Sequence, residues 1–228
     1  MQKLVIASNN PGKLREFQAM LAPLGIEVLT QAQLGIEEAE EPHCTFIENA
    51  LAKARHVSRA SGLPALADDS GICVQALGGA PGVYSARYAG DERGCDTLLA
   101  KPADCGSSRN AASPQSTEAP RELARRQADT RNNEKLLQDM RGVTDRRAHY
   151  YCVLVLLHHA DDPQPLIAEG EWHGEIAHAE RGEGGFGYDP LFWLPQLGKM
   201  SSELTRDEKA QLSHRAKALK VLLEKLKM

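Results

Sequence analysis

The stretch from His149 to His158 limits the fold of this chain more than any other feature. It reads His-Tyr-Tyr-Cys-Val-Leu-Val-Leu-Leu-His, so it is apolar almost throughout and predicts the strongest β-strand of the chain. A strand of this kind is typical of the centre of a sheet. The next segment, Pro165–Ala177, alternates between apolar and polar residues and predicts its antiparallel neighbour. The chain is therefore expected to be built around a sheet.

Helix and strand patterns alternate along the chain, which is typical of the α/β class. Lys3–Ala7 and Glu27–Leu29 are expected to be strands with a helix between them. Thr45 and Glu48 have the spacing of a capping box, so a second helix is predicted from there to about residue 60. A C-terminal helix is indicated by an apolar face made of Leu212, Ala216, Leu219, Leu223 and Leu226.

One long segment does not fit this alternation. From Asp91 to about Pro120 the chain is rich in Ser, Ala, Asp, Gly and Pro, and its only large apolar residues are Leu98 and Leu99. Such a segment cannot bury enough surface to offset the entropy that is lost on ordering. We therefore predict a single domain over residues 1–228 with a flexible low-complexity insertion at about residues 91–120. Helical character returns after it, up to Met140.

Charge and targeting signals narrow the classes of partner. The 228 residues carry a net charge of −4 with a pI of about 6.1, so there is no basic excess for a nucleic-acid polymer. The N-terminus lacks the apolar core of a signal peptide, and no apolar run reaches membrane-spanning length. The five cysteines form no CxxC pair, and their odd number favours reduced thiols. We expect a cytoplasmic protein without a membrane or nucleic-acid partner.

A polar turn directly after the first strand is a candidate phosphate site. Its residues are Ser8, Asn9, Asn10, Pro11, Gly12 and Lys13. A turn of this kind aims backbone N–H groups and a helix N-terminus at one point, and the lysine adds a positive charge. It is not a Walker A loop, because Ala7 and Leu14 stand where that motif needs a glycine and a Ser or Thr. An ordinary strand–turn–helix corner remains the alternative.

Adjacent carboxylates interrupt an apolar stretch at Asp68 and Asp69. Two such charges are costly in a strand unless a cation compensates them, and oxygen ligands without clustered His or Cys suggest Mg²⁺. Because strand side chains alternate, only one of the two is expected to point into the site. The acidic loop Glu37–Glu41 is a candidate source of a second carboxylate. The alternatives are a turn at a strand end for the aspartates and a solvated charge run for the glutamates.

Two further motifs suit a flat ligand with oxygen acceptors. The run Gly184–Pro190 contains several glycines, which let a backbone approach a ligand closely, and its Phe186 offers a stacking face. Ser213–Arg215 places two donor side chains next to each other. A glycine-rich hairpin turn and an exposed polar pair are the alternatives. Together with the phosphate turn and the acidic residues, these motifs match the parts that bind a nucleoside triphosphate.

The order of these motifs resembles the inosine triphosphate pyrophosphatase family, and most closely its bacterial dITP/XTP branch. The matching blocks are Ser8–Lys13, Thr45–Ala50 with Lys53, Ala67–Gly71, Leu77–Tyr88, Gly185–Pro190 and Ser213–Arg215. They are spread over nearly the whole chain. The pattern departs from the family in one place, because Asn133–Leu137 arrives only after the low-complexity insertion.

This resemblance implies an elongated α/β domain in which a long twisted mixed β-sheet is flanked by helices and two lobes enclose a central cleft. It also implies a homodimer and dependence on Mg²⁺. The implied reaction is hydrolysis of ITP, dITP or XTP to the nucleoside monophosphate and pyrophosphate, which cleanses the nucleotide pool. These substrates carry a keto oxygen at C6 of the purine, where adenine carries an amino group.

The resemblance also assigns roles to individual residues. Asp69 is the expected catalytic carboxylate, and Glu41 or its neighbour Glu40 would share the Mg²⁺ with it. The turn Ser8–Lys13 would hold the triphosphate, and Lys53 is a further cationic candidate. The other substrate contacts would be Ser70, Phe186, Gly187, Tyr188, Asp189, Lys209, His214 and Arg215.

Two other functions stay open on the sequence alone. A pyrophosphatase for modified pyrimidine triphosphates would keep the metal and phosphate parts and change the base pocket. A regulator that holds a nucleotide without turnover belongs to another class of protein. The pair Asp68 and Asp69 argues against this regulator, because carboxylates repel a phosphate unless a metal intervenes.

Overall fold

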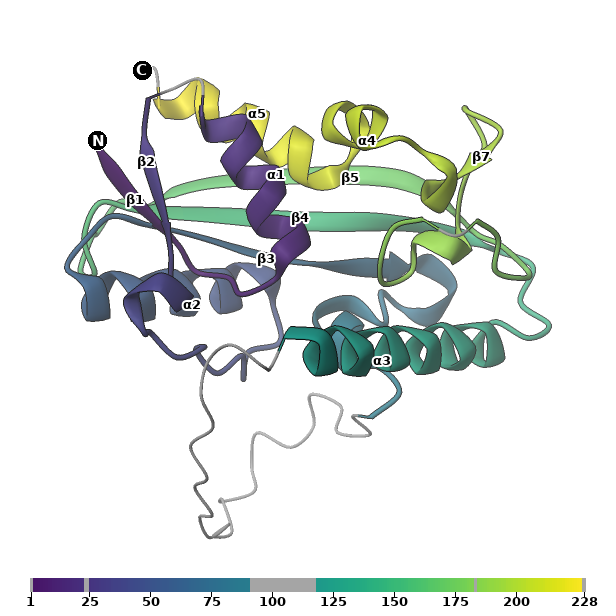
Figure 1. The fold of residues 1–228 in the computed structure, drawn as a ribbon. Helices are drawn as coiled ribbons and strands as arrows, with labels where there is room; N and C mark the ends of the chain where they lie inside the picture. The colour runs from purple at the N-terminus through teal and green to yellow at the C-terminus, as the bar shows by residue number, and fades with distance from the viewer. Residues whose placement is uncertain (1, 23–24, 91–117, 183, 227–228) are drawn as a thin grey trace, which may run out of the picture.

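Among the residues that the structure describes, seven strands form one mixed sheet in the order β2-β1-β3-β4-β5-β6-β7 (Figure 1). The computed structural model describes residues 2–22, 25–90, 118–182 and 184–226. β1 pairs in parallel with β2 and β3, and the pairs from β3 to β7 are antiparallel. The strands are β1 (Lys3–Ile6), β2 (Glu27–Thr30), β3 (Ala65–Val74), β4 (Arg147–Leu157), β5 (Leu166–Ile176), β6 (Phe192–Leu194) and β7 (Lys199–Met200).

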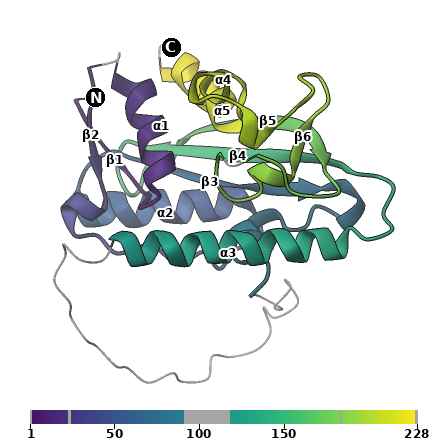
Figure 2. The same cartoon turned by 45° about the vertical axis from the view of Figure 1, so that its right-hand side comes forward.

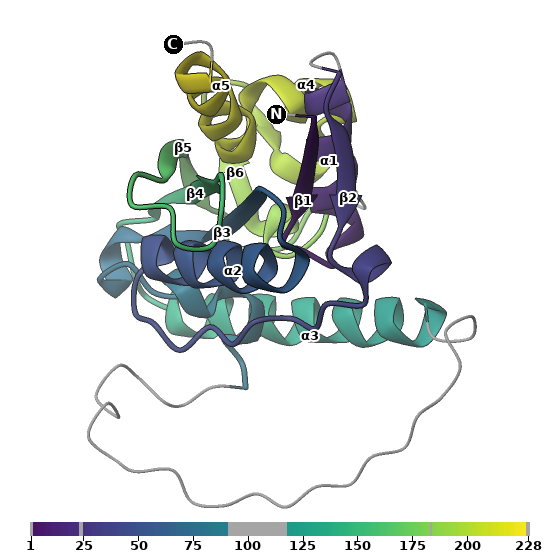
Figure 3. The same cartoon turned by 90° about the vertical axis from the view of Figure 1, so that its left-hand side faces the viewer.

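Helices cover both faces of this sheet. α1 and α5 lie on one face with α4 beside α5, and α2 and α3 lie on the other, as Figure 2 and the end view in Figure 3 show. The α-helices are α1 (Pro11–Leu21), α2 (Phe46–Ser61), α3 (Glu118–Asp139), α4 (Arg206–Leu212) and α5 (His214–Leu226). Short 3₁₀ turns are η2 (Ala32–Leu34), η3 (Gln75–Leu77), η4 (Gly82–Arg87), η6 (Asp189–Leu191) and η7 (Ser201–Glu203).

β4 occupies the middle of the sheet, as its apolar sequence predicts. It pairs antiparallel with β3 on one side and β5 on the other, and its residues Val153–Leu157 are fully buried. Leu154 packs in the core that contains residues of α1 and α5, whereas Val155 packs in the core that contains residues of α2. Both faces of β4 are therefore covered, which explains why the strand lacks polar alternation.

β3 runs without interruption through the acidic residues, so the alternative of a turn at this place is wrong. Asp68 pairs in register with Leu154 and Asp69 with Val153 of β4. Since strand side chains alternate, Asp68 lies on the face of α1 and α5, and Asp69 lies on the face of α2. The two adjacent carboxylates are thus separated by the sheet.

The helix start predicted at Thr45 is confirmed, and the first helix begins at Pro11 with a cap that the sequence analysis did not predict. The side chain of Asn10 caps α1 and accepts hydrogen bonds from the backbone N–H groups of Gly12 and Lys13 at 2.9 and 3.4 Å. Thr45 caps α2, and its side chain accepts a bond from the N–H of Glu48 at 3.3 Å. The cap at Asn10 fixes the N-terminus of α1 close behind the end of β1.

Gly170 of β5 lets α5 pack directly on the sheet. A Cβ atom at this position would overlap the carbonyl oxygen of His214 and lie 2.5 Å from the backbone nitrogen of Ala218. We expect Gly170→Ala to lower the free energy of unfolding by about 1–3 kcal/mol, because α5 must move away from the strand. Urea denaturation measures this loss. Gly90→Ala is the matched control, since among the described residues a Cβ there meets only the carbonyl oxygen of Arg87 at 3.9 Å. Equal stability of the two variants would contradict the prediction.

Other expectations from the sequence have mixed outcomes. Positions 91–117 of the predicted insertion lie outside the described residues, and positions 118–120 begin α3. Cys73 and Cys152 carry free thiols, but Cys44 is disulfide-bonded, so the expectation of reduced thiols is wrong at Cys44. In the part of the chain that the structure describes, no helix has the length and apolar character needed to cross a membrane.

Candidate functional site

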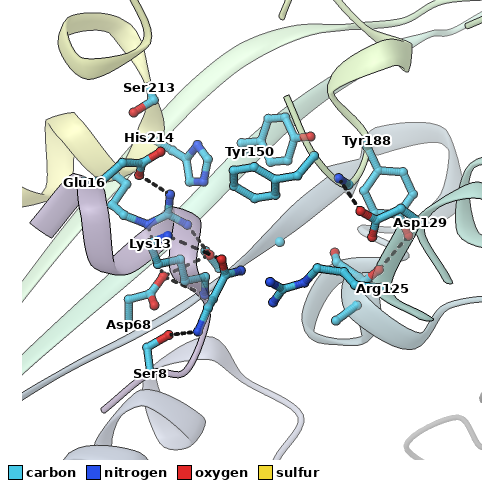
Figure 4. A pocket seen from close by; sticks show the side chains of 18 of the residues that line it. Ser8, Lys13, Glu16, Asp68, Arg125, Asp129, Tyr150, Tyr188, Ser213 and His214 are labelled. Carbon is cyan, nitrogen blue, oxygen red and sulfur yellow. Dashed lines mark hydrogen bonds and ion pairs between the residues drawn. The ribbon is translucent and has the colours of Figure 1, made fainter. Parts of the chain in front are cut away.

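Elements from both sides of the sheet line a cavity of about 490 Å³. Figure 4 shows Lys13, Glu16 and Asp68 together at one side of this cavity, and Arg125 with Asp129 at the other. The first group comes from α1 and β3, and the second comes from α3. The cavity is therefore built from segments that are far apart in the sequence.

The predicted phosphate turn forms one wall of the cavity. Ser8 Oγ accepts a hydrogen bond from the N–H of Asn10 at 3.2 Å, which shapes the turn ahead of α1. A Cβ atom at Gly12 would lie 3.4 Å from the ring of Phe186. The turn and the glycine-rich loop are thus neighbours.

Asp68 is held as an anion by two cations. Its Oδ2 atom lies 2.9 Å from Lys13 Nζ and 3.4 Å from Arg215 Nε, and Ser70 Oγ donates to it at 3.1 Å. Burial by itself would raise the pKa of Asp68, but the charges of Lys13 and Arg215 outweigh burial and hold this pKa well below its usual range. The ionised carboxylate therefore ties α1 and α5 to β3.

Arg215 extends this buried network to Glu16. The arginine is only 3% exposed, and its Nη1 atom lies 2.5 Å from Glu16 Oε2. Its Nη2 atom donates to Ser70 Oγ at 3.2 Å. The guanidinium lines the cavity, but it already has partners within the protein. Removal of one charge from this buried network would leave the charges of its partners uncompensated.

The surroundings of Asp69 raise its pKa, in contrast to those of Asp68. Lys53 Nζ lies 2.9 Å from Asp69 Oδ1 and 2.9 Å from Glu41 Oε1, so one ammonium group bridges two carboxylates. Burial raises the pKa of Asp69, Lys53 offsets only part of this effect, and the nearby Glu41 raises the pKa further. Asp69 Oδ2 is buried without a hydrogen-bond partner among the described residues. A carboxylate with a raised pKa and an unused oxygen is a candidate for chemistry.

The loop that carries Glu41 is fixed to α2 by Asn49. The Asn49 side chain accepts a hydrogen bond from the N–H of His43 and donates one to its carbonyl, each at 3.1 Å. Arg87 donates to the carbonyl of Glu41 at 3.3 Å. Glu40 is exposed and does not line the cavity. Of the two glutamates that the sequence left open, the geometry favours Glu41.

The residues around Asp69 fit a divalent cation such as Mg²⁺. No set of three or more His, Cys, Asp or Glu side chains converges on one point within the described residues. Mg²⁺ needs no such set, because it usually takes one or two protein carboxylates and completes its coordination with water and substrate phosphates. Asp69 Oδ2 is unpartnered and available for it, and Glu41 would join by exchanging its contact with Lys53 or Arg87 for the metal.

The carboxylate of Asp189 shapes the glycine-rich loop. Its Oδ2 atom accepts from the N–H of Phe186 at 2.8 Å and pairs with Lys209 Nζ at 2.5 Å. Its Oδ1 atom accepts from Ser201 Oγ at 2.7 Å. Phe186 remains 41% exposed beside the cavity, with Lys209 Nζ 5.8 Å from its ring centroid. An exposed aromatic face at this place suits the stacking role that the sequence predicts.

Helix α3 holds the same loop from the other side. Asp129 Oδ2 accepts from the N–H of Gly187 at 2.9 Å, and the Asn133 amide donates to the carbonyl of Gly187 at 3.2 Å. Tyr188 is 3% exposed, and its hydroxyl donates to the carbonyl of Ser85 at 2.8 Å. The polar group of Tyr188, like that of Asp189, therefore positions the loop.

His214 begins α5 as a buried ring at the cavity. It stacks on Tyr150, with ring centroids 4.8 Å apart and an interplanar angle of 9°. Burial, with a further contribution from Arg215, lowers the pKa of His214 well below its usual value, so the ring is neutral near pH 7. Its Nδ1 atom is buried and has no hydrogen-bond partner in the described part of the chain. That nitrogen is available to the polar edge of a flat ligand.

Most of the residues predicted from the sequence meet at this cavity. Those that line it are Ser8, Asn10, Lys13, Glu41, Lys53, Ser70, Phe186, Gly187, Tyr188, Asp189, Lys209, His214 and Arg215. Asp69 contacts this set through Lys53. Asn9, Pro11, Gly12 and Glu40 do not line it.

Sequence reasoning missed several cavity residues, among them Glu16, Arg125, Asp129 and Tyr150. Arg125 and Asp129 are four residues apart, and this spacing shows that they share a helix face. The spacing does not show that the face meets the glycine-rich loop, because the loop lies 58 residues further along the chain.

Comparison with protein families matches this chain to the Ham1 family over residues 4–120 and 116–225. A dITP/XTP pyrophosphatase from Ralstonia nicotianae is 56% identical over 228 residues, which cover 100% of this chain and 98% of that protein. A dITP/XTP pyrophosphatase from Nitrosomonas europaea is 54% identical over 226 residues, which cover 99% of this chain and 95% of that protein. The resemblance inferred from the motifs is confirmed.

Solved structures agree with this match. A HAM1 protein from Coxiella burnetii has a TM-score of 0.80 at 38% identity and covers 100% of this chain and 99% of its own. A nucleoside-triphosphatase / dITP/XTP pyrophosphatase from Mycobacterium abscessus has a TM-score of 0.67 at 32% identity and covers 97% and 99%. The predicted α/β fold with a mixed sheet flanked by helices is confirmed as well. By its family match and its full-length relatives, the chain belongs to the Ham1 family.

Proposed function

We propose that this chain hydrolyses the non-canonical purine nucleoside triphosphates dITP, XTP and ITP to the monophosphate and pyrophosphate. Its relatives named dITP/XTP pyrophosphatase align over its full length. One structural observation carries the proposal: a single cavity is bordered by the turn that contains Lys13 and by the ion pair of Lys53 with Glu41. Lys53 of this pair also contacts Asp69. A triphosphate of about four negative charges needs such a combination of cations and metal-binding carboxylates.

In this proposal, the phosphate groups are bound by the turn before α1 and by two lysines. The N-terminal N–H groups of α1 and the ammonium of Lys13 would bind phosphate oxygens. Lys53 would bind phosphate as well, since it borders the cavity and has two carboxylate partners from which it can turn. Mg²⁺ held by Glu41 and Asp69 would neutralise charge on the phosphates and on the leaving pyrophosphate.

Asp69 is the proposed general base. Its raised pKa makes it a better proton acceptor than an ordinary aspartate, and its Oδ2 atom, which Mg²⁺ would share, has no protein partner in the described residues. It would take the proton from the water that attacks the α-phosphorus, while the bond from this phosphorus to the bridging oxygen breaks. The products are the nucleoside monophosphate and pyrophosphate.

Selection of the base is assigned to Phe186 and His214. The exposed ring of Phe186 would stack on the purine, and the unpartnered nitrogen of His214 would meet its polar edge. A site that hydrogen-bonds the C6 keto oxygen leaves a polar group unpaired when adenine brings an amino group instead. Such an unpaired group can reduce kcat/KM by about 10⁴-fold or more.

A pyrophosphate-release assay across dITP, XTP, ITP, GTP and ATP tests this function. We expect kcat/KM for the first three to exceed that for ATP by about 10⁴-fold. Equal values for ATP would reject the assigned base selection. Faster turnover of modified pyrimidine triphosphates would favour the first alternative function, and nucleotide binding without pyrophosphate release would favour the regulator.

Three further properties belong to the proposal. Dependence on Mg²⁺ is supported by the fit of Glu41 and Asp69 described above. A homodimer is inferred from the resemblance to the inosine triphosphate pyrophosphatases, and a cytoplasmic location is inferred from the sequence alone.

A further inference from the structure

Arg125 of α3 faces the cavity, although the mechanism above does not use it. It lines the cavity wall, and Figure 4 shows its side chain extending from α3 toward the side that holds Ser8, Lys13 and Asp68. We propose that Arg125 is a further substrate-positioning residue that binds the polyphosphate of the nucleotide. This inference rests on the proposed function, because it assigns a contact within the same site.

The cations near the phosphate turn already have carboxylate partners. The pairs are Lys13 with Asp68, Lys53 with Asp69, and Arg215 with Glu16. Arg125 has no hydrogen bond and no ion pair with any residue that the structure describes. Asp129, one turn along α3, attracts Arg125 electrostatically, but the two side chains form no ion pair. An incoming phosphate can therefore bind Arg125 without first breaking a short contact with a carboxylate, which is the cost at the other three cations.

The position of Arg125 is fixed because α3 is anchored one and two turns further along. Asp129 accepts from the N–H of Gly187 at 2.9 Å, and Asn133 donates to the carbonyl of the same residue at 3.2 Å. Steps of four residues put Arg125, Asp129 and Asn133 on one helix face. The face that holds the glycine-rich loop thus continues to Arg125.

A guanidinium at this place suits a phosphate. It stays charged at every relevant pH, and its planar fork donates two parallel hydrogen bonds to phosphate oxygens. From the opposite wall the Arg125 side chain extends toward Lys13 and so toward the proposed phosphate site, whereas Phe186 and His214 are assigned to the purine. Arg125 would therefore fix the polyphosphate from the wall that faces the turn.

The experiment compares Arg125→Ala with Arg126→Ala, which removes the same charge from the next position of α3. Arg126 pairs with Glu122 at 2.8 Å and does not line the cavity. The probe is inorganic tripolyphosphate, titrated by calorimetry into the full-length chain with Mg²⁺ in excess. We expect the Kd to rise about tenfold in Arg125→Ala, as for a lost charge-assisted hydrogen bond. In Arg126→Ala it should change by less than about twofold.

In Arg125→Ala, the KM for dITP should rise by the same factor as the Kd for tripolyphosphate. The change in kcat should be smaller, because Arg125 contacts a part of the substrate that does not react. Equal Kd values for tripolyphosphate in the two variants would overturn the role of Arg125, whatever their turnover. A different outcome is that Arg125→Ala weakens tripolyphosphate binding while the wild-type protein releases no pyrophosphate from dITP, XTP or ITP. This outcome would refute the proposed function and retain the anion contact. The two failures are therefore distinguishable.

Discussion

Asp69→Asn is expected to lower kcat for dITP by about 10²–10⁴-fold, the range that a general base contributes. The protein should keep its fold, because the raised pKa of Asp69 means that the folded structure disfavours its charged form. An uncharged amide of the same shape removes the proton acceptor, and Lys53, which loses one carboxylate partner, keeps Glu41. Pyrophosphate release under saturating dITP measures the first effect, and thermal denaturation measures the second.

Asp161→Asn is the matched control for this variant. The Asp161 side chain is 87% exposed and forms only a surface ion pair with Arg59 at 3.2 Å, so the same chemical change should leave both turnover and melting temperature nearly unaltered. If Asp69→Asn hydrolyses dITP as fast as this control, Asp69 is not the base.

Arg215→Met is expected to cost about 3–5 kcal/mol of unfolding free energy, which is the range for breaking a buried ion pair. Its guanidinium is 3% exposed and faces two carboxylates, Asp68 and Glu16. The variant leaves Asp68 buried with Lys13 as its remaining cation. The melting temperature should therefore fall by about 6–20 °C for a chain of this size.

A second substitution tests the cause of this loss. Asp68→Asn removes the charge that Arg215 compensates, so the double variant Asp68→Asn with Arg215→Met should be less destabilised than the sum of the two single variants. Arg147→Met is the control, because Arg147 pairs with Asp145 on the surface and should change the melting temperature little. Strict additivity of the two substitutions would show that the pair does not act as a unit.

The neighbours Asp68 and Asp69 thus have opposite effects on stability. The lowered pKa of Asp68 means that its charge stabilises the fold above the unfolded-state pKa of about 3.9, and that this contribution is lost as the pH falls further. Asp69 has a raised pKa and makes no such contribution. This difference follows from the alternation of side chains along β3. Asp68 lies on the face where Lys13 and Arg215 pair with it, and Asp69 lies on the face that holds Lys53 and Glu41.

Much of the fold could be predicted from local patterns. The strand His149–His158 could be placed at the centre of the sheet because an apolar run requires cover on both faces, and the cap at Thr45 follows from its spacing to Glu48. The order of motifs was sufficient to identify the family. The acidic strand was harder, since the pattern allowed a turn where β3 continues unbroken.

The sequence by itself determined the class of fold, because periodicity is a property of single segments. It also determined the family and most of the residues that meet at the cavity, because the order of its motifs resembles that of a known family. Only the tertiary structure decided which partner each charge has. Arg215 and Glu16 are 199 residues apart, and Asp129 reaches a loop 58 residues away, so no local pattern reports their contact. The lining of the cavity, which includes Glu41 and Arg125 but not Glu40, was decided in the same way, because the environment of a side chain is made by segments that only folding brings together.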